Sequence, residues 1–471
     1  MNKGAPDRIL AVVKELIGTH ELLAVYRGQY IQLSAFPDNA GFGVDEVVVA
    51  TRLPYSTQYW TKYHPQGLYL APGGQDNWWE DHYGQGMIYK LVGDVWQLLA
   101  TFGRDANLDP DGFSDAGYVS CMFWDATLKK LYAIPWYQDW VDDWAAPNPQ
   151  PYDLYEVNTQ TGVVTGLGHS AVMRPVDEFP GYWSNPLCYC QQAAKFGNYW
   201  FITGVRQEEY VAWPGFYYER AVLYKFDPVA NTMVMIDAEP IDHETSTYNP
   251  GVATDGTTLY WWFIDDDAAN YIVYRRTVDG INFVTDEEHA NRTRWPYAEM
   301  KYNPANGRFQ VAGYGSTFPP LVQFGKLLYR NPAGSWVVDQ APGIAGDPYF
   351  VGSVGFRYVG NVCTYEYILA YAEAMAFWPP ANRQRVYSRA ANSTGAFVEE
   401  NVAGLQGGYP VNNAFASLSG RIYCFKGQQV FYRDGDVGAW IASQVFTEWL
   451  WSGGPLVHGF CIATSRPISE T

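Results

Sequence analysis

The sequence predicts an all-β protein, a β-propeller of seven or eight four-stranded blades, from three observations. A hairpin-like phrase recurs seven times along the 471 residues, at a mean spacing of about 57 residues. A second pair of strand-like runs lies between successive copies. Aromatic residues make up 17% of the chain, and no linker or low-complexity tract divides it. Two hairpins per repeat make four strands, which is one propeller blade.

Each copy of the phrase has a strand, a turn holding Gly, Asp or Asn, and a second strand opened by an aromatic or aliphatic residue. Those turn residues tolerate the positive φ of short hairpins, while Tyr, Val, Trp and Phe suit a pleated, half-buried surface. We expect these outer hairpins at residues 88–100, 154–166, 223–237, 273–285, 328–340, 386–400 and 430–443. The inner strand pairs are expected at residues 118–136, 187–205, 251–265, 297–315 and 413–427.

The two ends of the chain predict how the ring closes. Residues 20–36 resemble an outer hairpin, and residues 456–464 resemble an inner strand without followers. We expect 456–464 to pair with a strand between 21 and 35, which would remove two exposed sheet edges. Seven blades result if residues 20–36 are accessory, and eight if they are not. A pair of β-sandwiches is the alternative topology.

The predicted domain organisation is a docking helix in residues 1–20 and a single propeller domain over 21–471. Residues 6–18 read PDRILAVVKELIG, with Pro6 and Asp7 suited to a helix start and Gly18 to its end. The apolar residues of this segment fall on one broad helical face. Such a face must dock on the propeller or on a partner subunit.

Charge and composition exclude several classes of function. Forty-nine acidic and 31 basic residues give a net charge of −18, which disfavours nucleic acid and anionic membranes. No run of residues is long and apolar enough to span a bilayer, and the first segment does not have the pattern of a signal peptide. The six cysteines fall mostly in strand patterns, where cysteine acts as a small buried hydrophobe, so we expect synthesis in a reducing cytoplasm.

The sequence predicts no catalytic residue, no metal site and no cofactor. It contains no phosphate-binding glycine loop, no HExxH and no GxSxG. The seven histidines are scattered, with no pair at metal-ligand spacing. Acidic clusters at 139–143, 208–209 and 265–267 could bind calcium or act as acid and base, but solvated loop tips are the preferred interpretation.

Large aromatic residues in the longest insertions form the predicted binding surface. These insertions fall between the second and third strands of the expected blades, so they emerge on one face. Exposed aromatic side chains there can stack on sugar rings or anchor a protein interface, or they can pack on one another. The candidate binding residues are Trp78, Trp79, Trp136, Trp140, Trp144, Trp213, Tyr217 and Trp378.

The turns TVDGINF, NPAGSW and DGDVGAW are similar to degenerate Asp-box turns of sialidase-type propellers. None has the full Ser-x-Asp-x-Gly-x-x-Trp pattern, and the Arg-Ile-Pro segment and arginine triad of that family have no counterpart. The resemblance therefore implies the fold and not the enzyme. An acidic, aromatic-rich propeller with a short N-terminal helix also resembles propellers in the tails of tailed bacteriophages, such as nozzle and host-attachment proteins.

Two functions of different classes follow. The first is a non-enzymatic virion protein, located in the virus particle, whose partners are other virion proteins, further copies of itself or a host-surface glycan. It would bind no nucleic acid and would not insert into a membrane. The alternative is a carbohydrate-binding lectin or a sialidase-like glycoside hydrolase. The missing arginine triad favours the first.

Overall fold

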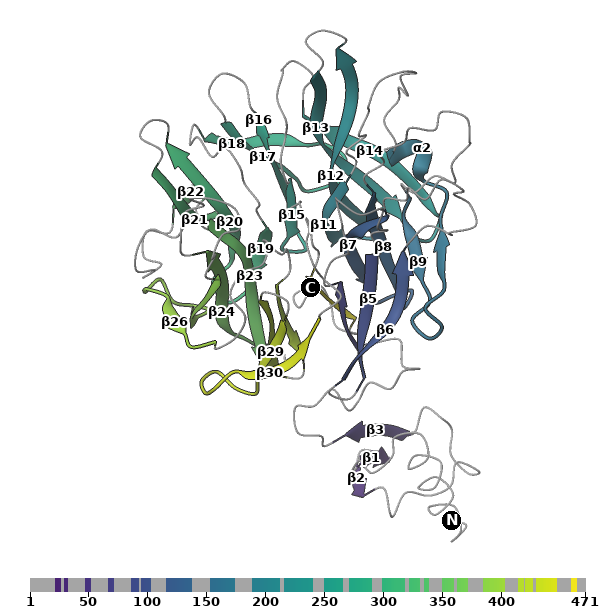
Figure 1. Cartoon of the computed structure of the whole chain (residues 1–471), viewed down its shortest axis with the longest axis vertical. Helices are drawn as coiled ribbons and strands as arrows, with labels where there is room; N and C mark the ends of the chain where they lie inside the picture. The colour runs from purple at the N-terminus through teal and green to yellow at the C-terminus, as the bar shows by residue number, and fades with distance from the viewer. Residues whose placement is uncertain are drawn as a thin grey trace, which may run out of the picture.

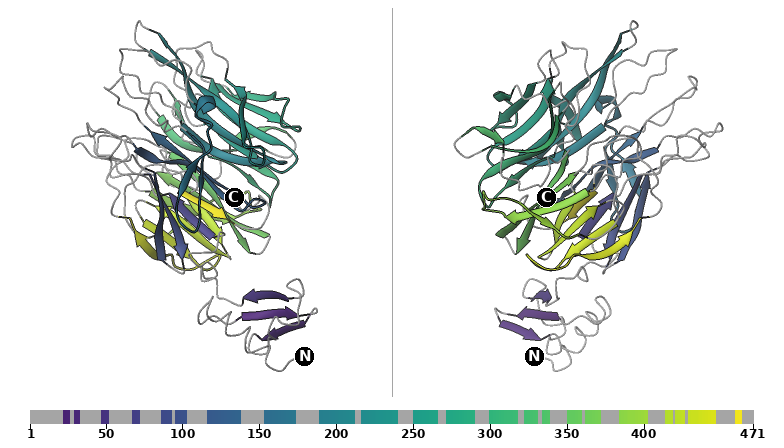
Figure 2. Two further views of the ribbon diagram at one scale, coloured as in Figure 1. Left: turned by 90° about the vertical axis from the view of Figure 1, so that its right-hand side faces the viewer. Right: turned by 60° about the vertical axis from the view of Figure 1, so that its left-hand side comes forward.

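The computed structural model is a β-propeller of seven four-stranded antiparallel blades, and it confirms the predicted fold class (Figure 1). A further sheet of three strands lies outside the ring (Figures 1 and 2). The structure describes residues 22–26, 29–32, 47–51, 67–71, 86–92, 95–102, 116–137, 153–173, 189–211, 216–239, 250–265, 271–289, 299–317, 322–330, 334–338, 350–359, 362–371, 384–402, 414–418, 420–426, 429–446 and 459–463.

The blades follow one another along the chain, and the strands of each blade lie side by side in order from the inner to the outer edge. Blade 1 has β31 (Gly459–Ala463), β4 (Gly67–Ala71), β5 (Gly86–Val92) and β6 (Val95–Phe102). Blade 2 has β7 (Ala116–Asp125), β8 (Lys130–Tyr137), β9 (Tyr155–Val157) and β10 (Val164–Gly166). Blade 3 has β11 (Tyr189–Phe196), β12 (Tyr199–Val211), β13 (Phe216–Asp227) and β14 (Thr232–Ala238).

The remaining four blades repeat this order. Blade 4 has β15 (Gly251–Thr254), β16 (Leu259–Asp265), β17 (Tyr271–Thr277) and β18 (Val284–His289). Blade 5 has β19 (Met300–Asn303), β20 (Arg308–Thr317), β21 (Val322–Arg330) and β22 (Trp336–Val338). Blade 6 has β23 (Phe350–Val359), β24 (Val362–Tyr371), β25 (Gln384–Ala390) and β26 (Val398–Glu400). Blade 7 has β27 (Phe415–Leu418), β28 (Arg421–Lys426), β29 (Gln429–Arg433) and β30 (Ile441–Val445).

The antiparallel order within each blade separates two faces of the ring. Turns that join the first strand to the second, and the third to the fourth, all emerge on one face, which we call the short-turn face. Connections from second to third strand, and from the fourth strand to the next blade, emerge on the other, which we call the long-loop face. The predicted insertions do join second to third strands.

Ring closure pairs the C-terminal strand with a different partner from the one predicted. β31 lies within the predicted segment, but it pairs with β4, from Gly459↔Ala71 to Ala463↔Gly67, and not with a strand between 21 and 35. The short apolar run Gly67–Ala71 is the first ring strand along the chain, and it is the sequence neighbour of β5. Closure through it completes blade 1 with four strands.

The hairpin predicted at residues 20–36 forms, but it belongs to the separate sheet. β1 (Leu22–Tyr26) pairs with β2 (Gln29–Gln32) and, on its other edge, with β3 (Val47–Thr51). An eighth blade is therefore not formed among the described residues, and the lower of the two predicted blade counts is confirmed. The predicted helix at 6–18 lies outside the described residues.

All seven predicted outer hairpins form the third and fourth strands of successive blades. The five predicted inner pairs are also confirmed, and the inner pair of blade 6, β23 and β24, is an addition to those expected from the sequence. One short helix, α2 (Ser170–Met173), follows β10.

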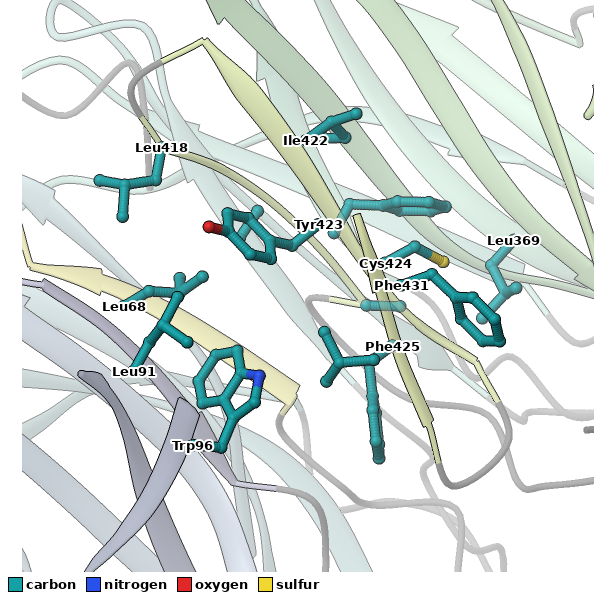
Figure 3. Close-up of a cluster of buried hydrophobic side chains, with 14 of the residues drawn as sticks. Leu68, Leu91, Trp96, Leu369, Leu418, Ile422, Tyr423, Cys424, Phe425 and Phe431 are labelled. Carbon is teal, nitrogen blue, oxygen red and sulfur yellow. The ribbon is translucent and has the colours of Figure 1, made fainter. Parts of the chain in front are cut away.

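Large aromatic side chains fill the space between blades. One cluster joins blades 6, 7 and 1 around Trp96, Tyr367 and Tyr423, all of which are buried (Figure 3). Between blades 4 and 5, the rings of Tyr274 and Trp336 stack with centroids 3.8 Å apart. Each fully buried large side chain contributes about 1.5–3 kcal/mol or more to stability, so the seams between blades are the core of the protein.

Candidate functional site

Gln192 ties three blades together at the centre of the ring. Its side chain projects from β11, the innermost strand of blade 3, and Gln192 is buried. Its Oε1 accepts hydrogen bonds from the backbone N–H of Val252 in blade 4, at 3.2 Å, and of Met300 in blade 5, at 3.0 Å. Innermost strands have a free edge, and buried backbone amides there need an acceptor. The Oε1 atom of Gln192 is the acceptor for two such amides, those of Val252 and Met300.

A buried carboxylate continues the same pattern. Glu299, directly before β19, has a fully buried side chain that accepts hydrogen bonds from Ser353 Oγ at 2.5 Å and from the Val354 N–H at 3.1 Å. Lys301 Nζ lies 2.7 Å from the other oxygen of Glu299. Ser353 Oγ in turn accepts a hydrogen bond from the Ala414 N–H at 3.0 Å. We call Gln192, Glu299, Lys301 and Ser353 the inner girdle.

The inner girdle lies toward the long-loop ends of the innermost strands. Every innermost strand runs from the long-loop face to the short-turn face. Glu299 and Ala414 directly precede their strands, and Gly251 and Met300 open theirs. A carboxylate, an ammonium, an amide and a hydroxyl thus tie the innermost strands of neighbouring blades together near this end, through contacts with one another and with backbone amides.

Ion pairs of a second kind lie between neighbouring blades. At three seams a carboxylate accepts both from a cation and from the indole N–H of a tryptophan in the next blade, a unit that we call a seam triad. The three seam triads are Asp125 with Lys195 and Trp200, Asp237 with Arg275 and Trp261, and Glu400 with Arg433 and Trp440. Because charge-assisted bonds are stronger than neutral ones, these units fix one blade against the next.

The pKa values of Asp125 and Asp237, two of the seam carboxyl groups, are shifted in opposite directions. Burial alone would raise the pKa of Asp125, but hydrogen bonds from Lys195, the Leu128 amide and Trp200 outweigh it and hold the pKa below its usual value. Burial raises the pKa of Asp237 in spite of the Arg275 charge and the Trp261 hydrogen bond. Both carboxyl groups are used for contacts between blades.

Most of the predicted binding residues lie outside the described residues, namely Trp78, Trp79, Trp140, Trp144, Trp213 and Trp378. The backbones of Trp136 and Tyr217 are described, and both lie in strands, β8 and β13, near the long-loop face. The aromatic surface as a whole stays a prediction.

Residues 206–220, one of the predicted long insertions and the one that contains Trp213 and Tyr217, are mostly strand. β12 and β13 continue as one antiparallel hairpin as far as Val211↔Phe216, so only residues 212–215 connect them. Pairing the two strands gives their backbone N–H and C=O groups partners along the ladder. This hairpin is the longest of the described ring hairpins and projects beyond its neighbours on the long-loop face (Figure 1).

Cysteine, histidine and metal chemistry are limited in the described part of the chain. Cys121, Cys190, Cys363 and Cys424 are free thiols and buried, and burial raises the pKa of Cys363 to about 12. His169 Nε2 lies 2.9 Å from Asn231 Oδ1, a structural contact between blades 2 and 3. No group of three or more potential metal ligands occurs among the described residues, and no helix among them could cross a membrane.

A sequence signal exists for the seam cations but not for the inner girdle. The third strand of several blades has a basic residue directly after a tyrosine, as in Tyr274-Arg275, Tyr329-Arg330 and Tyr432-Arg433. This repeat could have identified the ion pairs. Gln192, Glu299 and Ser353 come from different positions of three repeats, so no motif unites them.

The likeness to known proteins concerns the fold alone. No family model matches the chain, and no curated protein matches it in sequence. A puromycin-hydrolyzing peptidase of Mycobacterium tuberculosis is similar with a TM-score of 0.45 and 11% identity, over 84% of this chain and 57% of that one. The chain therefore spans little more than half of the peptidase.

Two further solved structures are similar at the same level. The GH93 alpha-L-arabinofuranosidase of Fusarium graminearum has a TM-score of 0.39 and 12% identity, covering 64% of this chain and 84% of that one. A putative 6-phosphogluconolactonase of Bacteroides uniformis has a TM-score of 0.41 and 11% identity, covering 80% and 95%. Propellers host unrelated activities, so these likenesses assign none to this chain.

Proposed function

We propose that the protein is a non-catalytic structural component of a virus particle, of the kind found in the tails of tailed bacteriophages. The ring acts as a rigid support. Its long-loop face binds a neighbouring virion protein, a further copy of the chain or a host-surface glycan.

The observation that carries this proposal is the use of buried charge between blades. In each seam triad the carboxylate of one blade forms an ion pair with a cation of the next blade and accepts a hydrogen bond from a tryptophan of that same blade. Removing one partner of such a buried pair costs about 3–5 kcal/mol, so the pairs hold blades in fixed relative positions. A protein that transmits load or fixes geometry in an assembly benefits from that rigidity.

The position of the long connections supports binding on one face. The connections from second to third strand, in which the predicted aromatics fall, all emerge on the long-loop face. Two of the short turns on the opposite face have an aliphatic residue at the tip, and these residues, Val229 and Val437, are about four-fifths exposed. These valines are isolated in separate blades, and single exposed aliphatic residues are common on any protein surface.

Fractionation tests the assignment to a particle. The chain, tagged at its C-terminus and produced in its natural source, should sediment with particles in a density gradient and resist removal by moderate salt. Recovery only as a free monomer would contradict the proposal.

Paired variants test the binding face. Changing Trp140 and Trp213 together to Ala should weaken incorporation or partner binding about a hundredfold, because a buried tryptophan anchor contributes about 2 kcal/mol or more. The control changes Val229 and Val437 to Ser on the short-turn face, and should bind as the wild type does. If the tryptophan variant instead loses its melting transition while its folded fraction binds normally, these residues only pack on one another.

A lectin or glycoside hydrolase is the second candidate, and the inner girdle is the observation that favours it. Glu299, Lys301 and Ser353 place a carboxylate, an ammonium and a hydroxyl near the long-loop ends of the innermost strands. A glycan panel tests this candidate. Saturable binding that Lys301→Met weakens would support it, and absence of binding to any glycan would remove it.

A further inference from the structure

The hairpin of blade 3 continues beyond the strands on either side of it. β11 pairs with β12 only as far as Val205, and β14 pairs with β13 only as far as Val222. β12 and β13 themselves stay paired up to Val211↔Phe216, on the long-loop face (Figure 1). Beyond the flanking strands the hairpin is therefore a two-stranded ribbon over residues 206–221, which we call the blade 3 ribbon.

Two arginines hold the base of the blade 3 ribbon. Arg206 on β12 and Arg220 on β13 lie directly opposite each other in the register. Arg206 Nη1 donates to the Val172 carbonyl of α2 at 3.2 Å, and Arg220 Nη1 donates to the Glu239 carbonyl at 3.5 Å. Each strand is thus tied to a neighbouring segment at its base. A hairpin of two strands alone is marginally stable in water, so the ribbon beyond this base is suited to the addition of a third strand.

The outer edge of β13 has backbone groups that no described strand pairs. The Glu239 N–H donates to the Ala221 carbonyl at 2.9 Å, and Glu239 Oε2 accepts from the Ala221 N–H at 3.0 Å, so both backbone groups of Ala221 face outward. Successive residues of an antiparallel strand face opposite edges in turn. The N–H and C=O groups of Glu219 and Tyr217 therefore face outward as well.

Glu239 ends the ladder that β14 forms along this edge. In a regular ladder its backbone carbonyl would accept from the Ala221 N–H. Its side chain takes that place, and its carbonyl accepts from Arg220. The backbone thus leaves the ladder at Glu239, and no described strand pairs with the ribbon beyond Ala221 on this side. An open strand edge of this kind is a template for pairing with another chain.

The outer edge of β13 is complementary to a second copy of itself. Antiparallel pairing about Tyr218 sets Tyr217 of each copy opposite Glu219 of the other, so that all four outward groups form hydrogen bonds. Tyr218 then lies opposite Tyr218 of the second copy, at a non-hydrogen-bonded position where aromatic pairs stabilise a sheet. No two acidic residues lie opposite each other in this register.

The other free edges are less suited to such pairing. The inner edge of β12 has a register shift at Glu208, with a second glutamate, Glu209, beside it. Blade 5 has a similar ribbon, but its outer strand β21 contains Gly325 and Lys326. Bulges, charged residues and glycines protect or weaken strand edges. Those features are absent from the outward-facing pair of residues Tyr217 and Glu219, apart from one glutamate.

We propose that two copies of the chain pair through the outer edges of their blade 3 ribbons, as one antiparallel sheet with a twofold axis at Tyr218. A contact between identical surfaces closes on itself and gives a discrete dimer. This inference rests on the proposed function for the use of the long-loop face. It names a further copy of the chain as a partner there, and it places Tyr217, one of the predicted binding residues, at the contact.

Sedimentation equilibrium of the purified full chain tests the contact. The wild type should be a dimer at about 100 μM chain. Tyr218→Lys sets two lysines opposite each other and should raise the dissociation constant about tenfold or more, as should Tyr218→Glu. An equimolar mixture of the two variants should recover the dimer, because lysine then lies opposite glutamate. A monomeric wild type, or a mixture no tighter than either variant alone, would overturn the proposal.

Tyr314→Lys is the matched control, because it makes the same substitution in the ribbon of blade 5, where Tyr314 pairs with Gly325. It should leave the dissociation constant unchanged. An equal loss of dimer in Tyr314→Lys and Tyr218→Lys would show a general effect of charge and would also overturn the proposal.

Hydrogen exchange of the wild type decides the matter even if the Tyr218 variants do not fold. The amides of Tyr217 and Glu219 should be protected in the dimer and exchange faster on dilution to the monomer. Protection that persists in the monomer would show that another segment of the same chain covers the edge, against the proposal. A monomeric wild type would leave the virion assignment intact, because that assignment is read from particle sedimentation. A dimer that never sediments with particles would contradict the virion assignment and support the ribbon contact.

Discussion

Asp286 on β18 and Arg330 on β21 form a two-point ion pair across the seam between blades 4 and 5, with oxygen–nitrogen distances of 2.6 and 2.9 Å. Arg276 adds a third contact to the same carboxylate at 2.9 Å. One buried acid thus holds two arginines, from the third strands of two successive blades.

Asp286→Asn should destabilise the ring by about 3 kcal/mol, because it leaves the mostly buried Arg330 guanidinium without a counter-charge. The measurement is the midpoint of urea unfolding. Glu399→Gln is the control, since the Glu399–Arg385 pair has side chains that are 48% and 28% exposed. That variant should cost less than about 1 kcal/mol. Equal costs for the two variants would show that the seam pair does not fix the blades.

The buried Lys90 side chain should make the free energy of unfolding increase with pH. Burial at the seam between blades 1 and 2 lowers its pKa to about 8, and its Nζ donates to the Thr159 carbonyl at 3.4 Å. In the unfolded chain the lysine pKa is about 10.4, so between pH 8 and about 10.4 the unfolded chain binds more protons at this residue than the folded protein does. The free energy of unfolding therefore increases as the pH rises through this range. Relative to Lys90→Met, the wild type should gain on the order of 2 kcal/mol between pH 7.5 and 10.

The comparison with Lys90→Met is needed because buried tyrosines and cysteines titrate in the opposite sense. Burial raises the pKa of Tyr367 to about 12, so ionisation of this tyrosine at high pH favours the unfolded state. This lowers the free energy of unfolding equally in the wild type and in Lys90→Met. Lys130→Met, at a half-exposed lysine paired with Glu156, is the control for removal of a charge. A difference that does not change with pH would contradict the burial of a charged Lys90.

Gly355 marks the closest approach of the innermost strands of blades 6 and 7. A Cβ added there would lie 2.1 Å from the Cβ of Phe415. Gly355→Ala should therefore destabilise the protein by about 1–3 kcal/mol or more, measured by thermal and urea unfolding. Gly395→Ala, where the nearest atom is Ser393 Oγ at 3.2 Å, should change stability by less than about 0.5 kcal/mol.

Strand β31 should decide whether the ring closes. A chain that ends at residue 458 lacks it, while a chain that ends at 464 retains all its backbone pairs with β4. The shorter chain should lose cooperative unfolding and elute as a larger or aggregating species, because β4 then presents an open edge. The longer chain should behave as the wild type. Monomeric, cooperative unfolding of both would show that closure does not depend on this strand.

Local hairpin chemistry made the blades predictable from the sequence, since each outer hairpin is contiguous and has its own turn residues. The closure was not predictable in the same way. Gly67–Ala71 is a five-residue apolar run whose partner lies at the other end of the chain. Residues 206–220 have no polar–apolar alternation that would indicate a strand, and only the pairing of β12 with β13 shows that they extend as a ladder.

The candidate site was harder still, because its residues meet only after the ring has formed. Gln192 contacts amides of two other blades, and nothing near it in sequence indicates those partners. Arg275, Arg330 and Arg433, by contrast, each follow a tyrosine in the third strand of a blade, and this repeat was open to prediction. Side-chain contacts between repeats follow from the ring geometry, which no single repeat encodes.

The composite first blade has a consequence for the order of folding during synthesis. Blades 2 to 7 are each contiguous in sequence, so each can form soon after it leaves the ribosome. β4 is made before all of them, and its inner edge waits for β31 until the six other blades exist. Slow codons near the end of the message, or a chaperone bound to the last part of the nascent chain, would therefore prolong an intermediate in which the inner edge of β4 is exposed. The yield of closed rings should depend on how quickly β31 is synthesised and released.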